Sequence, residues 1–226
     1  MTAAERFAAY VAHELRTLLA TQRALVELAL SDPNADVAGW RETGEHVLGA
    51  CRQQERLLEA CLSLARSRGG LQRCEPVDLA GIVADALGAH ELGALEPVVL
   101  LEPSRTTGDP DLLERLVANL VSNAVRHNIA GGRVEVATRT EAGRAVLTVA
   151  NTGPVVPAVE LPRIFQPFQR LNSNPRSFSD GVGLGLTIVK AIADAHRAVV
   201  SAQARASGGL AIGVSFTSIR VAYSLG

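Results

Sequence analysis

Two long amphipathic segments open the chain. Between residues 3 and 31, apolar side chains recur at steps of three and four residues with no Gly or Pro among them, the spacing that places them on one face of an α-helix. A run of turn-forming residues from Ser31 to Asp36 follows, and a second apolar stripe continues to about Arg68. The pattern predicts an antiparallel helical hairpin with an uncovered apolar face, which a second copy would complete to a four-helix bundle.

The pattern changes after Gly69-Gly70. Helical spacing over about 79–89, 110–127 and 184–196 alternates with short apolar runs at 98–101, 134–137, 145–149 and 213–216. This alternation predicts an α/β sandwich with helices on one face of a mixed sheet, so the chain as a whole is α+β. We expect a first domain over residues 1–68, a linker over 69–75 and a second domain over 76–226.

Composition narrows the functions that such a chain could have. Its 226 residues include 22 basic and 23 acidic side chains, and Lys190 is the single lysine. This balance argues against a polybasic surface for nucleic acid or membrane. The three cysteines form no CxxC pair, so neither a zinc site nor a disulfide framework is indicated. No apolar stretch approaches the roughly 20 residues that span a bilayer.

A nucleophile, a carboxylate and a hydroxyl lie together in the first predicted helix. Thr17 lies one helical turn beyond His13, and Glu14 lies beside it. The three could act on one substrate group, or they could be a solvated polar patch on an exposed helix face.

A second polar cluster lies in the predicted helix over 110–127. Asn119, Asn123 and Arg126 share one face at steps of four and three residues. Carboxamide oxygens suit Mg²⁺ and a guanidinium suits phosphate. Ordinary capping or surface positions remain the alternative.

A glycine-rich run opens the last predicted helix. Gly181, Gly183 and Gly185 would let backbone N–H groups approach a phosphate at a helix N-terminus. A dinucleotide-binding unit needs a strand directly before such glycines, whereas a polar loop over 170–179 precedes them here. The context disfavours a nicotinamide cofactor and favours a mobile lid.

Taken in order, these motifs resemble the core of a sensor histidine kinase of two-component signalling. His13 to Thr17 is similar to the H box, Asn119 to Asn128 to the N box, Asn151-Thr152-Gly153 to the G1 box, Arg163 to Phe168 to the F box, and Gly181 to Leu186 to the G2 box. The resemblance covers nearly the whole chain. It implies a dimerisation and phosphoacceptor hairpin followed by a GHKL-type ATP-binding domain.

The resemblance also implies roles for individual residues. His13 would accept the γ-phosphate of ATP, Glu14 would serve as general base or orienting partner, and Thr17 with Glu14 would orient water in a reverse, phosphatase reaction. Asn123 would hold Mg²⁺. The implied nucleotide-binding residues are Asn119, Asn123, Arg126, His127, Asn151, Gly153, Gly181, Gly183, Gly185 and Leu186.

The same resemblance implies the cofactors and partners. ATP and Mg²⁺ are the expected cofactors, a second copy and a response-regulator receiver domain are the expected partners, and nucleic acid is not. We expect this chain to be the cytoplasmic portion of a membrane sensor whose membrane-crossing segment lies outside it.

Two residues depart from the family pattern. Leu18 stands where proline is usual, which keeps a backbone hydrogen bond and predicts a straighter first helix. Asn151 stands where aspartate is usual, so its bond to an adenine amino group would lack a charge and be weaker by about 1 kcal/mol; on this ground Asn151→Asp would tighten nucleotide binding. A degenerate kinase that binds nucleotide or regulator without phosphotransfer is therefore the alternative function.

Overall fold

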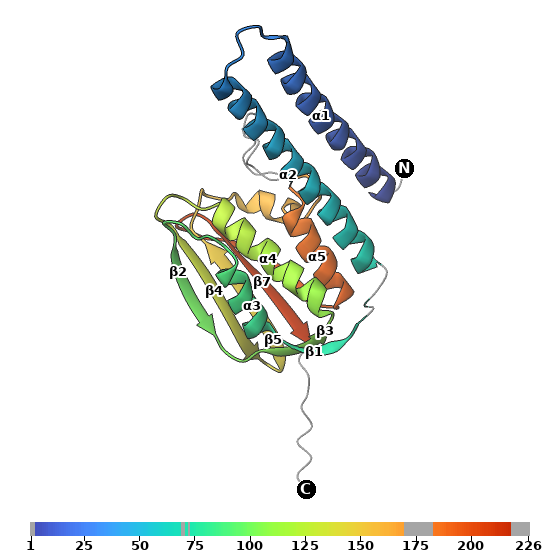
Figure 1. The fold of residues 1–226 in the computed structure, drawn as a ribbon. Helices are drawn as coiled ribbons and strands as arrows, with labels where there is room; N and C mark the ends of the chain where they lie inside the picture. The colour runs from blue at the N-terminus through green and yellow to red at the C-terminus, as the bar shows by residue number, and fades with distance from the viewer. Residues whose placement is uncertain (1–2, 69–70, 72, 170–182, 218–226) are drawn as a thin grey trace.

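The first unit of the fold is a helical hairpin. The computed structural model describes residues 3–68, 71, 73–169 and 183–217. Helix α1 (Ala3–Ser31) and helix α2 (Val37–Arg68) run antiparallel (Figure 1). Asp36 caps α2, because its carboxylate accepts a hydrogen bond from the Gly39 N–H at 2.8 Å. The predicted hairpin is confirmed, with the turn at the expected place.

Helix α1 continues without a break through Leu18. A leucine retains the backbone N–H that proline lacks, so an uninterrupted helix is the expected result here. The Leu18 side chain is only 4% exposed and belongs to the same buried apolar cluster as Ala50 and Leu57 of α2. Leu18 therefore contributes packing as well as helix continuity.

The second unit is a mixed sheet with helices on one face (Figure 1). Its five strands lie in the order β2 (Glu96–Leu101), β4 (Arg133–Glu141), β5 (Arg144–Asn151), β7 (Leu210–Thr217) and β6 (Val199–Ala204). The β2–β4 pair is parallel and the other pairs are antiparallel. The covering helices are α3 (Leu79–Gly88), α4 (Pro110–Arg126) and α5 (Gly185–Ala195). The predicted α+β class is confirmed.

Several short elements were absent from the sequence prediction. Strand β1 (Glu75–Asp78) pairs antiparallel with β3 (Arg105–Gly108) in a separate small sheet, and a 3₁₀-helix, η1, covers Ala158–Arg163. Strands β1 and β3 have four residues each and carry little apolar alternation. Edge strand β6 was also missed, because the two valines that begin it are followed by Ser, Ala and Gln, which give a weak strand signal.

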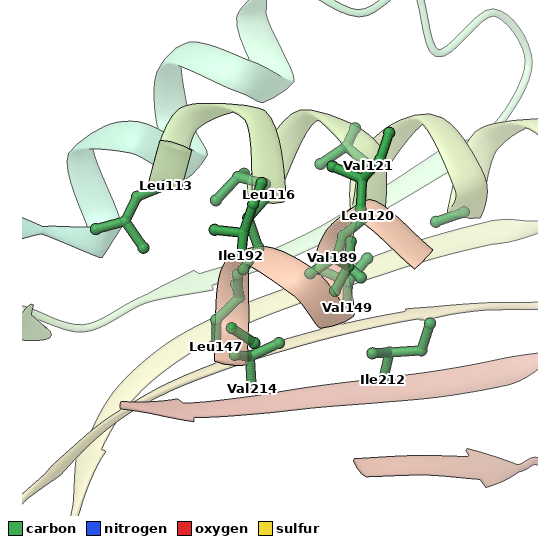
Figure 2. Packing of buried hydrophobic residues seen from close by; sticks show 14 of the residues in the cluster. Leu113, Leu116, Leu120, Val121, Leu147, Val149, Val189, Ile192, Ile212 and Val214 are labelled. Atoms are coloured by element: carbon green, nitrogen blue, oxygen red, sulfur yellow. The ribbon is translucent and has the colours of Figure 1, made fainter. Parts of the chain in front are cut away.

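The core of the second unit lies between the helices and the sheet. Leu116 and Leu120 of α4 and Ile192 of α5 lie in one buried cluster with Leu147 of β5 and the neighbouring strand residues (Figure 2). All four side chains are 0–1% exposed. This packing fixes α4 and the start of α5 relative to the end of β5. None of the described helices has the length and apolarity needed to cross a membrane.

A buried histidine joins the end of α5 to the start of α4. His196 Nδ1 lies 2.8 Å from the Ile192 carbonyl oxygen, and Nε2 lies 3.0 Å from the backbone nitrogen of Asp109, the residue that caps α4. The amide can only donate, so Nε2 must accept and Nδ1 must carry the proton. Burial lowers the pKa of His196, while the Ile192 carbonyl and the Asp109 charge oppose that change.

Because His196 is buried and neutral in the fold, we expect the free energy of unfolding to fall in mild acid. The unfolded chain binds a proton at His196 with a pKa near 6.5 and the folded chain only at lower pH, so stability falls as the pH drops below about 6.5. Urea unfolding between pH 5 and 8 checks this against His196→Gln, whose carboxamide can bond to both partners without titrating. The variant should have the flatter profile; parallel profiles would contradict the assignment.

The residue after this histidine, Arg197, has a left-handed backbone conformation, and a glycine at this position should stabilise the protein. Arg197 has φ +53°, and the Arg197 and Ala198 amides donate to Asp194 and Ala193 in the pattern of a Schellman helix end. A side chain in this left-handed conformation costs about 1–2 kcal/mol, which glycine avoids at some entropic cost. Arg197→Gly should raise the free energy of unfolding by about 0.5–1 kcal/mol. Arg197→Ala, which removes the charge and keeps the Cβ, should bring no such gain in the same denaturation experiment.

Candidate functional site

One pocket gathers the polar motifs of the second unit. Its volume is about 660 Å³, and it lies between the C-terminal half of α4, the end of β5, η1 and the start of α5. These elements are placed by the apolar core beneath them, so side chains far apart in sequence meet at one edge of the sandwich.

Most of the predicted nucleotide residues line this pocket. Those in the lining are Asn119, Asn123, Arg126, His127, Asn151, Gly183, Gly185 and Leu186. Gly153 is not among the lining residues, although it lies directly beside them: a Cβ on it would be 2.6 Å from the His127 carbonyl oxygen. Gly181 and the expected lid over 170–179 lie outside the described residues. The sequence prediction thus named residues that the fold brings together.

The asparagines of the pocket differ in what their carboxamides do. Asn119 Nδ2 donates to the Arg115 carbonyl at 2.7 Å, and Asn128 Nδ2 donates to the Ala124 and Arg133 carbonyls at 3.2 and 2.9 Å. Asn151 Nδ2 is likewise bound to backbone. Within the described part of the chain, Asn123 is the pocket asparagine whose side chain has no such bond. Its half-buried carboxamide is therefore available to a ligand.

Asn151 ties the end of β5 to the end of α4. It is 4% exposed, and its Nδ2 donates to the His127 carbonyl at 3.2 Å and the Thr152 carbonyl at 2.6 Å. Because both partners are acceptors, the nitrogen must be the atom that faces them. The remaining oxygen can accept a hydrogen bond in the pocket. Aspartate could not replace the two donated bonds, so the expectation that Asn151→Asp tightens nucleotide binding does not fit this geometry.

The start of α5 supplies a backbone surface to the pocket. Gly183 has φ +73°, a conformation that side chains rarely adopt. Gly185 is the first residue of α5, and the first N–H groups of a helix have no partner within it. A partial positive charge accompanies this end, so the arrangement suits an anionic group such as a phosphate.

One wall of the pocket was not predicted from sequence. Val155, Val156, Pro157 and Ile164 form its apolar part, with Leu210 at the start of β7. An apolar wall beside an acceptor oxygen suits a flat heterocycle such as a nucleobase. The Pro-Val-Val-Pro run from 154 to 157 was the available signal, since apolar residues in a loop are unusual unless something covers them.

The His13 cluster lies on α1, outside this pocket. The His13 and Thr17 side chains are exposed and Glu14 is half-buried. Thr17 Oγ1 donates to the His13 carbonyl oxygen at 3.0 Å, which leaves its lone pairs available to accept from water or substrate. An exposed imidazole can reach a phosphoryl donor that another part of the protein holds.

The oxygen donors of the pocket fit a hard cation. A site built from three or more His, Cys, Asp or Glu side chains does not occur among the described residues. The unengaged carboxamide of Asn123 is instead the type of single hard ligand that Mg²⁺ takes when substrate phosphates and water supply the rest.

Comparison with known families agrees with this geometry. Residues 108–220 match the model of the histidine kinase-, DNA gyrase B- and HSP90-like ATPases, and residues 3–70 match the His kinase A (phospho-acceptor) domain. The chain belongs to the sensor histidine kinase family.

Individual relatives place the chain among sensor proteins. It is 45% identical to the sensor protein CutS of Streptomyces coelicolor over 219 residues, which are 95% of this chain and 53% of CutS. It is 37% identical to the sensor protein kinase PmrB of Pseudomonas aeruginosa, over 87% of this chain and 42% of PmrB. The chain thus spans about half the length of these relatives. The solved Acinetobacter baumannii histidine kinase AdeS shares the fold, with a TM-score of 0.70, 20% identity and coverage of 91% of this chain and 97% of that chain.

Proposed function

We propose that this chain is the catalytic core of a sensor kinase, which transfers the γ-phosphoryl group of ATP to His13 and then to an aspartate of a receiver domain. The observation that carries the proposal is the pocket between α4, β5 and α5, in which Arg126, the N-terminal end of α5 and the Asn123 carboxamide, which has no hydrogen bond among the described residues, meet an apolar wall. This combination suits a purine nucleotide with its phosphates.

The proposed roles of the pocket residues follow from their positions. The Asn151 oxygen accepts from the adenine amino group, while Arg126, His127 and the Gly183–Gly185 backbone contact phosphate oxygens. Asn123 holds Mg²⁺, which neutralises charge on the phosphates. Asn119 and Leu186 line the same pocket and Gly153 lies beside it, and we propose that these residues, with Gly181, contribute to nucleotide binding.

The proposed transfer uses a ring nitrogen of His13 as nucleophile. Its lone pair forms a bond to the γ-phosphorus as the bond to the β,γ-bridging oxygen breaks, and ADP leaves with that electron pair. Glu14 orients the imidazole and accepts its proton. In the reverse reaction on the regulator, Thr17 and Glu14 orient a water molecule. We propose that the phosphoacceptor domain covers residues 1–68, the linker 69–75 and the ATP-binding domain 76–226.

We also propose that the hairpin forms a homodimeric four-helix bundle. The hairpin carries large apolar side chains that are 52–78% exposed: Leu19, Leu28, Leu30, Val37, Leu48, Leu58 and Leu62. This many exposed large apolar side chains on one hairpin is unusual for a monomer and fits a second copy. Because the chain spans about half of the sensors that it resembles, we place it at the cytoplasmic side of a membrane, as the part that meets ATP and the receiver domain.

Labelling with γ-³²P-ATP and Mg²⁺ tests this function. The wild-type chain should acquire acid-labile label, His13→Ala should acquire none, and the control His46→Ala, which removes an exposed histidine of α2, should label normally. Nucleotide binding without label in the wild type would instead support the degenerate binding module.

A further inference from the structure

A ring stack within one chain connects the hairpin to the nucleotide pocket. The Tyr10 ring of α1 stacks on the Phe168 ring, with centroids 3.5 Å apart and planes at 29°. Helix α2 also packs along α5 in the same chain (Figure 1). The second unit is thus held against both helices of its own hairpin.

Phe168 is in direct contact with the rim of the pocket. Its backbone N–H donates to the Gly183 carbonyl at 3.0 Å, and a Cβ on Gly183 would lie 3.0 Å from the Phe168 carbonyl carbon. Gly183 lines the pocket. Phe168 has φ +65°, a left-handed conformation that is rare for a bulky residue and persists only where its surroundings hold it. The ring is therefore presented to α1 by a constrained backbone.

Tyr10 lies on the same face of α1 as the acceptor histidine. Three residues separate Tyr10 from His13, which corresponds to about 4.5 Å along the helix axis and nearly one turn. Gly183, Phe168 and Tyr10 thus form a series of contacts that runs from the rim of the pocket to a residue one helical turn from the His13 of the same chain.

We propose that phosphoryl transfer takes place in cis, from the pocket of one chain to the His13 of that chain, with the Tyr10–Phe168 stack as the positioning contact. The proposal rests on the proposed kinase function. It adds a statement about which of the two His13 residues of a dimer accepts the phosphoryl group. Tyr10 is a positioning residue, because it acts by placing the second unit and not by touching the reacting atoms.

Heterodimers with one inactive chain test the cis assignment. Wild-type chain is co-expressed with a differently tagged His13→Ala/Asn123→Ala chain, and dimers carrying both tags are purified. In cis transfer, the wild-type chain of these heterodimers takes up label from γ-³²P-ATP at the same rate per chain as in the wild-type homodimer. In trans transfer it takes up none, because its partner has neither pocket nor acceptor, and that result would overturn the proposal. Failure of the wild-type homodimer to label would refute the kinase function itself, which is a separate outcome.

Substitutions of Tyr10 test the positioning role. Tyr10→Ala should lower kcat of autophosphorylation about tenfold, because misplacement of a reacting group slows the transfer step. KM for ATP should stay within about twofold, because the nucleotide residues lie in another element. Tyr10→Phe keeps the ring and should restore the rate. An unchanged kcat in Tyr10→Ala, or equal losses in Tyr10→Ala and Tyr10→Phe, would exclude the ring stack as the positioning contact.

Discussion

Replacing Asn123 by alanine should lower the rate of autophosphorylation by about 100-fold or more. The substitution weakens binding of the Mg²⁺ that stabilises the charge on the phosphates, and this raises the activation free energy by several kcal/mol. The fold should be little affected. The Asn123 side chain is half-buried and has no hydrogen bond within the described residues, so its removal leaves no partner unsatisfied. Thermal unfolding and γ-³²P labelling of the same preparation measure both effects.

Ser122→Ala is the matched control for this loss. Ser122 precedes Asn123 on α4 and also lines the pocket, but it is not among the residues proposed to hold Mg²⁺ or the nucleotide. The control should retain most of the wild-type rate. Equal activity of Asn123→Ala and wild type would remove Asn123 from the metal site.

Asn151→Asp should be the most damaging single-atom change in the pocket. The carboxylate would lose both bonds that Asn151 donates and would place charge beside the His127 and Thr152 carbonyl oxygens, at a position 4% exposed. An unsatisfied buried group of this kind costs about 2 kcal/mol of stability. Nucleotide affinity should fall with it, although a charged acceptor would favour the adenine amino group.

The pH dependence of this variant provides a second readout. The environment disfavours ionisation of an aspartate at 151, so its pKa would be raised and the stability deficit relative to wild type should shrink from pH 8 to pH 5. Asn34→Asp, at an exposed position in the hairpin turn, is the control and should show no deficit. Tighter nucleotide binding by Asn151→Asp, with unchanged stability, would contradict the hydrogen-bond assignment.

The sequence was most informative where chemistry and periodicity coincide. The hairpin, α4 and α5 follow from apolar spacing, and the Asn119–Asn123–Arg126 face follows from helical geometry, so the pocket could be anticipated from residues that lie on one side of a helix. The fold then brought these residues together with Asn151 and Gly183 from other elements.

Features that depend on tertiary contacts could not be anticipated. From the sequence, Asn151 is interpreted as a weaker adenine ligand than the usual aspartate. Its hydrogen bond to the His127 carbonyl, which connects the end of β5 to the end of α4, depends on the tertiary structure. Strands β1 and β3 are defined by their pairing with each other and not by their own alternation. The stack of Tyr10 on Phe168 joins residues 158 positions apart, for which no local pattern exists.

The central claim is that ATP bound in the pocket phosphorylates His13. The most direct test of this claim is to identify the residue that carries the phosphoryl group. After incubation with ATP and Mg²⁺, peptides of the wild-type chain can be mapped by mass spectrometry under neutral conditions that preserve phosphohistidine. The account predicts the phosphoryl group on the peptide that contains His13, with loss on acid treatment. A phosphoryl group on a serine or threonine that survives acid, or a chain that binds ATP and carries none, would contradict it.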